Sequence, residues 1–175
     1  MNPPYKITNK ILDLISKISN IQGSFSSLNL ATPEPQLRKS NRIKTIKGTL
    51  AIEGNTLNFD QITALLDGKK VVGKQSEIQE VINTNTLYDS IDTFKYTSIK
   101  DLLKSHKILM TNILRDAGNF RSKNVGILKG KKVNHIAPKP VMVPELIKNL
   151  FTWAKNDREV HFLIKSCILK LEKPE

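Results

Sequence analysis

Apolar residues recur every three or four positions along most of this chain, and this spacing places them on one face of an α-helix. The first run predicts a helix from about Thr8, an N-cap residue, to just before Gly23. Its expected apolar face is Ile11, Leu14, Ile15, Ile18 and Ile21. Further runs of this period predict helices over about 37–53, 58–67, 76–91, 98–117, 144–153 and 160–171.

One stretch breaks the helical period. Residues 125–136 hold two short runs on either side of the turn Lys129–Gly130–Lys131, which predicts a β-hairpin. Pro138 and Pro140 end it, because proline cannot donate to a strand ladder. The whole pattern predicts an all-α fold of about six or seven helices with one β-hairpin, in a single domain.

The helix predicted over about 37–53 ends on a carboxylate. Gly54 and Asn55 both accept the left-handed conformation that stops a helix, so Glu53 falls in the last turn. The unpaired carbonyls there disfavour a carboxylate by about 0.3–1 kcal/mol. The positions at helical spacing from it supply no cation: Thr49, Leu50, Thr56 and Leu57. Two interpretations stay open: a solvated glutamate at a helix end, or a carboxylate that pairs with a cation from elsewhere in the fold.

The net charge of the chain is compatible with several classes of partner and does not distinguish among them. The 175 residues include 28 Lys and Arg against 16 Asp and Glu, a formal charge of +12. This balance favours polyanions, anionic membrane surfaces or acidic protein faces, and a Lys-rich composition also arises without any of them. Aromatic residues make up 6%, too few for an evident base-stacking platform, and no nucleic-acid-binding signature occurs. Nucleic acid is therefore not the expected partner.

The single cysteine, Cys167, excludes an internal disulfide and a cysteine-based metal site. It lies in an apolar run, which predicts a buried position. The N-terminal residues lack the apolar stretch of a secretory signal, and no apolar run reaches the roughly 18 residues that cross a bilayer. A cytoplasmic protein without a membrane segment is expected.

The residues alone show no catalytic constellation. His106, His135 and His161 lie too far apart to be metal ligands on one helix, and no phosphate-binding glycine loop occurs. His106 falls on the apolar side of its helix, where we expect a hydrogen-bonded core histidine. The helix before Gly54 carries basic residues that we expect to form a solvated face or to contact phosphate: Arg38, Lys39, Arg42, Lys44 and Lys47.

The stretch around Glu53 resembles a known family. Thr49-x-x-x-Glu53-Gly54 is similar to the [S/T]-x-x-x-E-[G/N] inhibitory motif of the Fic family, whose members transfer AMP from ATP to hydroxyl groups of other proteins. Blocks that resemble the family follow in its order: 77–81, 106–110, 118–121 and 137–138. The resemblance implies a Fic-like domain over 1–175. Its expected parts are a Fic N-terminal region with the inhibitory helix over about 7–57, the start of the Fic core over about 58–167, and a divergent tail over 168–175.

The family's catalytic signature, H-P-F-x-x-G-N-[GK]-R, does not occur in the sequence. In the family it supplies a histidine base, the groups that bind phosphate and Mg²⁺, and an arginine that holds the γ-phosphate of ATP. The resemblance implies that Glu53 pairs with that arginine, that Thr49 braces the motif and that Gly54 allows close backbone approach. We therefore expect a truncated Fic protein, incomplete at its C-terminus and inactive alone. It needs no cofactor itself, whereas the intact family uses ATP and Mg²⁺.

The predicted hairpin is similar to the family's flap, which docks the target protein by strand addition. The resemblance assigns to it Ile127, Leu128, Lys129, Gly130, Lys131, Lys132, Val133 and His135. Gly118 and Arg121 match a family position that leads into the flap, and a structural role is expected for both.

The expected partners are a protein substrate on the flap and a second copy of the chain, through apolar surface where the catalytic helix would pack. Two other functions stay open. An antitoxin-like inhibitor would direct Glu53 against the arginine of a separate Fic enzyme. A basic helical module would bind nucleic acid with an affinity that falls steeply as salt rises.

Overall fold

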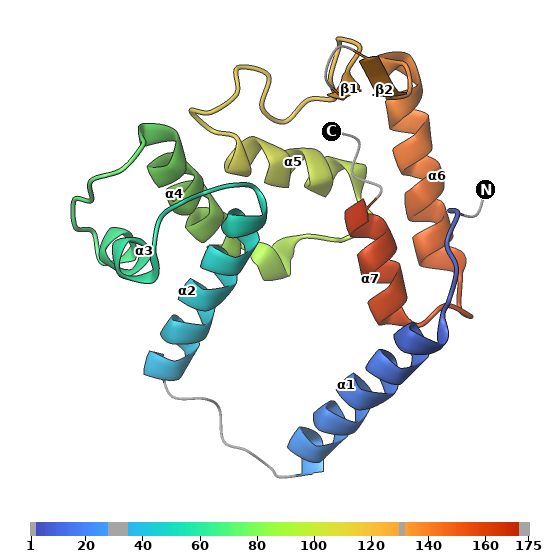
Figure 1. Ribbon diagram of the computed structural model, residues 1–175, viewed down its shortest axis with the longest axis horizontal. Helices are drawn as coiled ribbons and strands as arrows, with labels where there is room; N and C mark the ends of the chain where they lie inside the picture. Colours follow the sequence, from blue (N-terminus) through green and yellow to red (C-terminus); the bar gives the residue numbers. More distant parts are fainter. Residues whose placement is uncertain (1–2, 28–34, 130–131, 172–175) are drawn as a thin grey trace. The chain divides into compact units, whose positions relative to one another are not determined.

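The computed structural model describes residues 3–27, 35–129 and 132–171 (Figure 1). Its helices and strands are α1 (Asn9–Ser27), α2 (Pro35–Ile52), α3 (Phe59–Leu66), α4 (Gln75–Asp89), α5 (Ile99–Leu109), β1 (Gly126–Lys129), β2 (Lys132–Ile136), α6 (Val143–Asn156) and α7 (Phe162–Leu171). Two 3₁₀ turns, η1 (Ile91–Thr93) and η2 (Pro140–Met142), precede α5 and α6. The seven α-helices of the described residues confirm the predicted all-α class. None of these helices is long and apolar enough to cross a membrane.

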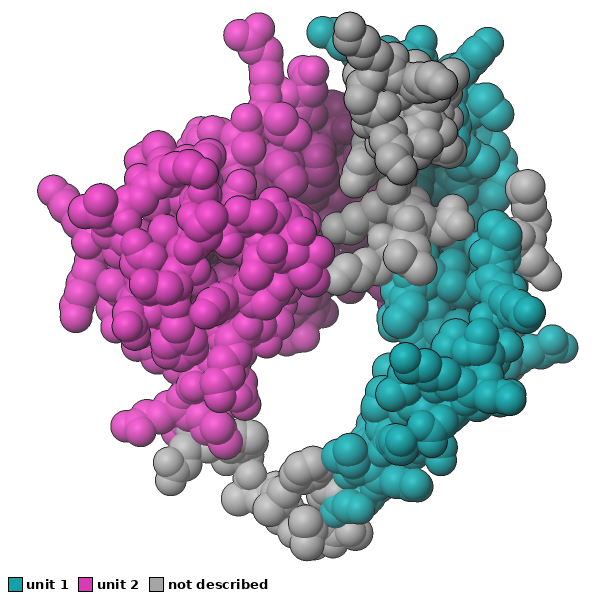
Figure 2. Space-filling view, viewed as in Figure 1, with its two compact units in different colours: residues 1–32, 122–175 teal, residues 33–121 magenta. Residues whose placement is uncertain are grey.

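The chain divides into two compact units, coloured separately in Figure 2. Unit 1 comprises residues 1–32 and 122–175, and unit 2 comprises residues 33–121. The single Fic-like domain expected over 1–175 stays a prediction.

Unit 2 contains α2, α3, α4 and α5. The first three of these helices contact one another, and α5 packs on α4. Their shared core consists of Ile43, Ile46, Leu50, Leu57, Ile62 and Val81, each 5% exposed or less. Ile43, Ile46 and Leu50 follow the helical spacing from which α2 was expected, so the apolar pattern of this helix does set its buried face.

Two helix starts in unit 2 follow their local signals. The Asn58 side chain accepts from the Gln61 N–H at 2.9 Å, and the Gln61 side chain accepts from the Asn58 N–H at 2.9 Å. This is a capping box, and it starts α3 where the apolar period predicts a helix from about residue 58. The Ser98 hydroxyl accepts from the Asp101 N–H at 3.2 Å and caps α5 in the same manner.

The end of α5 differs from the expectation of a helix reaching residue 117. The helix stops at Leu109, and Asn112 adopts a left-handed φ of 62°. The Asn83 side-chain amide, on α4, donates to the carbonyls of Leu109 and Thr111 at 2.8 Å each. These bonds satisfy carbonyls at the helix end, which lets the backbone leave the helix after Leu109. The apolar period of the sequence continues beyond that residue and therefore predicts a helix that is too long.

Unit 1 contains α1, the strand pair, α6 and α7. Its core cluster is Trp153, Ala154, Ile164 and Ile168, with Ile11 and Ile15 of α1 packed against it. Only part of the apolar face predicted for α1 is therefore buried. Leu14, Ile18 and Ile21 are 47%, 46% and 58% exposed.

Cys167, in the C-terminal helix α7, was expected to be buried. This expectation is wrong: the side chain is exposed. Ile164 and Ile168, one helical turn apart, form the buried face, while Cys167 beside it is exposed and Phe162 is 59% exposed. An apolar composition around the helix predicts burial only where another element packs, and in the described residues one face of α7 is covered.

The strands β1 and β2 pair antiparallel where the sequence predicts the hairpin. Gly126 pairs with Ile136 and Lys129 with Lys132, with an irregularity between Ile127 and Leu128. The Ala137 N–H donates to the Val125 carbonyl at 3.1 Å and extends the pairing by one bond. Gly130 and Lys131 lie outside the described residues. The role of this segment as a docking flap stays a prediction.

Candidate functional site

The C-terminal turn of α2 carries the glutamate that the sequence singles out. The Asn55 N–H donates to the Leu50 carbonyl at 3.1 Å, and the Gly54 N–H donates to the Ala51 carbonyl at 3.2 Å. Gly54 has a φ of 90°. These two bonds around a left-handed glycine form a Schellman motif, in which Glu53 occupies the last position before the glycine. The predicted helix stop at Gly54 and Asn55 is therefore confirmed.

Glu53 is exposed, and its carboxylate forms no hydrogen bond or ion pair with any described residue. It stands at the negative end of the α2 dipole, where a carboxylate is disfavoured. Ile52 beside it is 72% exposed. A negative charge in this position is available to a cation from outside unit 2.

Thr49, expected to brace this motif, is also exposed, and within the described part of the chain its hydroxyl makes no hydrogen bond. The bracing role of Thr49 stays a prediction. Gly54 is exposed, and a Cβ built on it would meet no atom within 4 Å. Its left-handed φ is thus the local reason for glycine at this position.

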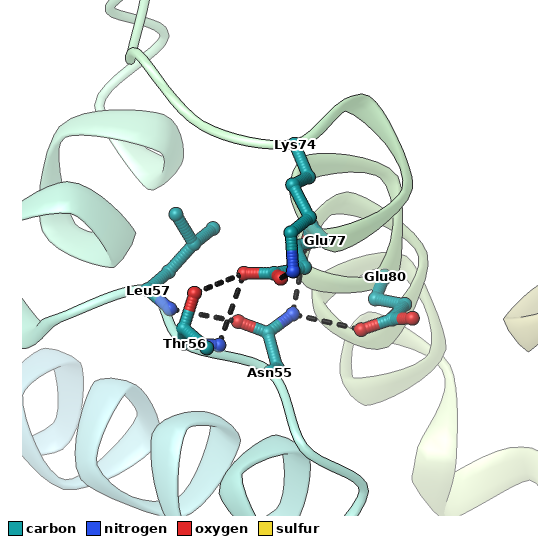
Figure 3. Close-up of polar contacts among 6 residues, drawn as sticks. All are labelled: Asn55, Thr56, Leu57, Lys74, Glu77 and Glu80. Atoms are coloured by element: carbon teal, nitrogen blue, oxygen red, sulfur yellow. Dashed lines mark hydrogen bonds and ion pairs between the residues drawn. The ribbon is translucent and has the colours of Figure 1, made fainter.

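A buried carboxylate holds the segment that follows this turn (Figure 3). Glu77, in the first turn of α4, is 6% exposed. Its Oε2 accepts from the Thr56 N–H at 3.0 Å and from the Thr56 hydroxyl at 2.7 Å. The Lys74 ammonium lies 2.9 Å from its Oε1. The Thr56 hydroxyl, then Lys74 and the Thr56 amide, lower the pKa of Glu77 to about 2.

Asn55 adds a second set of bonds between the same two elements. Its side-chain amide donates to the Glu77 carbonyl at 3.0 Å and to the Glu80 Oε2 at 2.8 Å. Its side-chain oxygen accepts from the Leu57 N–H at 3.1 Å. Figure 3 shows these side chains meeting between the segment after α2 and the first turns of α4. Reasoning from the sequence did not identify this contact with Glu77. The available signal was an acidic residue in the first turn of a helix, with a lysine three residues before it.

The basic residues of α2 do not all form the expected solvated face. The Arg42 guanidinium donates to the Asn85 carbonyl at 2.6 Å, pairs with Asp89 at 2.8 Å and lies 6.0 Å from the Tyr88 ring centre. Lys39 pairs with Asp67 after α3 and lowers the pKa of that carboxyl. These two cations tie α2 to its neighbours. The exposed basic residues of this helix are Arg38, Lys39, Lys44 and Lys47, of which Lys39 has the ion pair with Asp67.

His106 is hydrogen-bonded, as expected, but only half-buried. Its Nδ1 accepts from the Gly118 N–H at 2.9 Å. Gly118 has a φ of 86°, and a Cβ on it would lie 2.8 Å from the Lys107 Cβ. Glycine is required here by both the backbone and the close approach of α5, and the role expected for Gly118 in leading into the flap stays a prediction. Arg121, three residues later, is half-buried at the end of unit 2.

Metal-ligating side chains do not gather in the described residues: no group of three or more His, Cys, Asp or Glu could hold a metal ion. His106 belongs to unit 2 and His161 to unit 1, and His135 lies in β2.

Comparisons with known proteins point in one direction. Residues 96–172 match the model of the Fic/DOC family. The chain is 24% identical over 153 residues to protein adenylyltransferase fic-1 of Caenorhabditis elegans, an alignment that covers 82% of this chain and 29% of that protein. It is similar to the crystal structure of a Fic family protein from Desulfovibrio desulfuricans G20, with 40% identity and a TM-score of 0.83. That match covers 97% of this chain and 52% of the other. The chain thus spans about half or less of the length of these relatives.

Proposed function

We propose that this chain, whose residues 96–172 match the model of the Fic/DOC family, is the regulatory and target-docking part of a protein adenylyltransferase. In this proposal Glu53 is the inhibitory glutamate, and the hairpin β1–β2 docks the target protein. The AMP-transfer chemistry requires groups that this sequence does not contain. The name of the nematode relative, a protein adenylyltransferase, supports this class of reaction.

One observation supports the proposal most: Glu53 is an exposed carboxylate without a cation among the described residues, on a turn that is itself firmly held. Its turn is bonded to α2 through the Leu50 and Ala51 carbonyls. A guanidinium is the natural counter-ion, because it stays charged and can bind both oxygens of one carboxylate. An arginine paired with Glu53 is no longer free to hold the γ-phosphate of ATP.

The strand pair β1–β2 supports the docking role. In the described residues it forms a sheet of two strands, so each strand has a neighbour on one side only. A target segment adding to the free edge would be bound mainly through backbone hydrogen bonds, which tolerate many sequences. The residues that we assign to docking remain Ile127, Leu128, Lys129, Gly130, Lys131, Lys132, Val133 and His135.

The 175-residue chain alone should transfer no AMP. The histidine base, the phosphate-binding groups and the Mg²⁺ ligands of the family belong to the signature H-P-F-x-x-G-N-[GK]-R, which the sequence lacks. Loss of a general base alone costs about 10²–10⁴-fold in rate, and loss of phosphate positioning adds to it. Incubation with labelled ATP, Mg²⁺ and a cell extract should leave every protein unlabelled. Label on any protein that depends on the chain would contradict this expectation.

The inhibitory role is tested against a Fic enzyme that carries the catalytic signature but has no inhibitory glutamate of its own. Adding the 175-residue chain should lower label transfer by that enzyme, and Glu53→Ala should abolish the effect. Glu145→Gln, which neutralises an exposed glutamate of α6, is the matched control and should inhibit like the wild type. Equal inhibition by wild type and Glu53→Ala would exclude the proposed role of Glu53.

Action in trans is a second candidate function, and one observation favours it. The hydrogen bonds described for the Glu53 turn, and those between Glu77 and Thr56, all lie within unit 2. The glutamate is therefore positioned without help from catalytic residues, as an antitoxin-like inhibitor of a separate Fic enzyme requires. Co-purification of the chain with such an enzyme from the native cell would distinguish this function from inhibition within one polypeptide.

A further inference from the structure

We propose that Glu77 is the positioning residue for Glu53: its carboxylate fixes Thr56 and thereby the turn that presents the inhibitory glutamate. This inference rests on the inhibitory role proposed for Glu53. It adds a second acidic residue to the same site, with a different task. Glu53 is exposed and available to a cation. Glu77 is buried and bonded to Thr56, in the segment that follows Glu53 (Figure 3).

The contacts between Glu77 and the segment after α2 use both the side chain and the backbone of the glutamate. Its Oε2 accepts two bonds from Thr56, at 3.0 Å from the amide and 2.7 Å from the hydroxyl. Its main-chain carbonyl accepts from the Asn55 side chain at 3.0 Å. Two consecutive residues are thus bonded to one residue of α4, and bonds to a charged acceptor are stronger than neutral ones.

These bonds complete the restraint of the Glu53 turn. On its helix side, the Glu53 N–H donates to the Leu50 carbonyl of α2 at 3.0 Å. On its far side, Thr56 is bonded to Glu77 of α4. Gly54 and Asn55 lie between these two anchors. Gly54 is the most permissive backbone position in the segment, so the turn needs an anchor on each side to stay in one conformation.

The electrostatic settings of the two glutamates are opposite. Glu77 lies in the first turn of α4, where the helix dipole favours a negative charge, and Lys74 lies 2.9 Å from it. With a pKa of about 2, the Glu77 carboxyl is ionised in the folded protein at neutral pH. Glu53 lies at the end of α2, where the dipole disfavours a negative charge. Glu77, at a position where a negative charge is favoured, thus fixes the turn that carries Glu53, at a position where a negative charge is disfavoured.

Amide hydrogen exchange, measured by NMR on the full chain, tests this role directly. Glu77→Gln removes the charged acceptor of Thr56 while keeping the shape of the side chain. Exchange at the amides of Gly54, Asn55 and Thr56 should then accelerate at least about tenfold through local opening. The amide of Ile46, in the middle of α2 and fully buried, should change by less than about threefold.

Glu80→Gln is the matched control. Glu80 also accepts from Asn55, at 2.8 Å, but Thr56 is hydrogen-bonded to Glu77 and not to Glu80, so exchange at Gly54 and Thr56 should stay within about threefold of wild type. Unchanged exchange of the turn in Glu77→Gln would overturn the proposal. Equal acceleration at Ile46 would also overturn it, because Glu77 would then act on the stability of unit 2 as a whole.

A second pair of variants avoids any change to α4. Thr56→Val removes the hydroxyl donor at 2.7 Å from Glu77 and keeps the backbone bond, so the turn should open by a smaller factor than in Glu77→Gln. Thr56→Ser restores the hydroxyl and should return exchange to the wild-type rate. Failure of this rescue would show that the hydroxyl bond does not restrain the turn.

Inhibition of the separate Fic enzyme then links position to function. Glu77→Gln should lose inhibition although it stays folded, and Glu80→Gln should keep it. If Glu53→Ala abolishes inhibition while Glu77→Gln inhibits as the wild type does, the positioning role fails and the proposed function stands. If the wild-type chain does not inhibit, the proposed inhibition in trans fails, and the exchange rates alone decide whether Glu77 positions the turn.

Discussion

Unit 2 and unit 1 are about equally rich in helices, but they bury their apolar residues to different degrees. In unit 2 the side chains Ile46, Ile62 and Val81, from three different helices, are each 1% exposed or less. In the described residues of unit 1, the cluster around Trp153 is smaller and its Ile164 is 9% exposed, while Val143 and Ile147 are buried outside this cluster. A core shared by three helices fixes each helix against two others, whereas a small cluster leaves other faces free.

Polar contacts follow the same division. In unit 2 the buried residues include Glu77, Asn83 and Thr84, and the first two join α4 to segments distant in sequence. In unit 1 the corresponding contact is between Asp157 and Lys165 at 3.4 Å, near the start of α7. Leu14, Ile18 and Ile21 of α1 remain exposed. The part of the chain that carries Glu53 is therefore fixed by its own buried contacts, which suits a residue that must meet its partner at a defined position.

The largest expected effect is the loss of stability when a buried side chain is truncated in the core of either unit. Ile46→Ala should lower the free energy of unfolding by about 2–5 kcal/mol, because the side chain is completely enclosed and leaves a cavity. Ile168→Ala, in the smaller cluster of unit 1, should cost about 2 kcal/mol, at the lower end of that range. Urea denaturation followed by circular dichroism measures both.

Leu14→Ala is the control for this pair. Leu14 is 47% exposed on α1, so its truncation should change stability by less than about 0.5 kcal/mol. A loss at Leu14 as large as that at Ile46 would show that the exposed face of α1 is covered in solution. The second copy of the chain that we predict as a partner would then be the first explanation to test, by measuring molar mass as a function of concentration.

The next effect concerns the polar contacts of unit 2. Asn83→Ala should cost about 1–3 kcal/mol, because the Leu109 and Thr111 carbonyls both lose their donor. Gln79→Ala removes only the bond that Asn83 accepts, at 2.8 Å, and should cost less. Thermal unfolding monitored by circular dichroism ranks the two variants. An equal cost for both would mean that the end of α5 does not depend on Asn83.

This dependence explains which parts of the fold can be predicted from sequence. The stop of α2 at Gly54 and the start of α3 after Asn58 each depend on residues within a few positions of one another, and both were predicted correctly. The end of α5 is set by Asn83 from another helix, so the apolar period alone placed it too late. Cys167 was placed inside for the same reason: composition indicates an apolar segment but not which face meets a neighbour.

The candidate site divides in the same way. Glu53 and Gly54 could be named because their helix-end position is visible in a few consecutive residues. Glu77 could not be given its role, because its partner Thr56 lies 21 positions away and only the fold brings the two together. Arg42 was expected on a solvated face, yet it binds the Asn85 carbonyl and Asp89 on α4. A basic run does not reveal which of its members will find an acceptor.

A smaller difference in stability is expected between substitutions of Gly48, within α2, and of Gly54, just after its end. Gly54→Ala should destabilise the protein by about 1 kcal/mol, because alanine is strained at a φ of 90°. Gly48→Ala, in the exposed interior of the same helix, should stabilise it by about 0.5–1 kcal/mol, because a Cβ there meets no atom within 4 Å. Denaturant titration gives both values. The same sign for the two variants would contradict the assignment of Gly54 as the helix stop.

The last expected effect is a change with pH rather than a fixed loss. The pKa of Glu77 is lowered from 4.5 to about 2 by the Thr56 hydroxyl, Lys74 and the Thr56 amide. The folded state therefore binds this proton less readily than the unfolded state does, so the stabilisation from Glu77 is complete above about pH 4.5. It is lost as pH falls towards 2. In unit 1, the Val160 amide and Lys165 lower the pKa of Asp157 from 3.8, which predicts a loss with the same sign that begins at a lower pH.

Glu77→Gln and Asp157→Asn should each flatten the acid dependence of stability in their own unit. Trp153 is the only tryptophan of the sequence and lies in the core of unit 1, so its fluorescence reports on that unit. The Ile46 amide reports on unit 2 by NMR. With Glu77→Gln, the acid-induced change at Ile46 should shrink more than the change at Trp153, and Asp157→Asn should do the reverse. Equal shifts of both reporters in both variants would show that the two units lose their structure together, and the contrast between their cores would then not extend to acid unfolding.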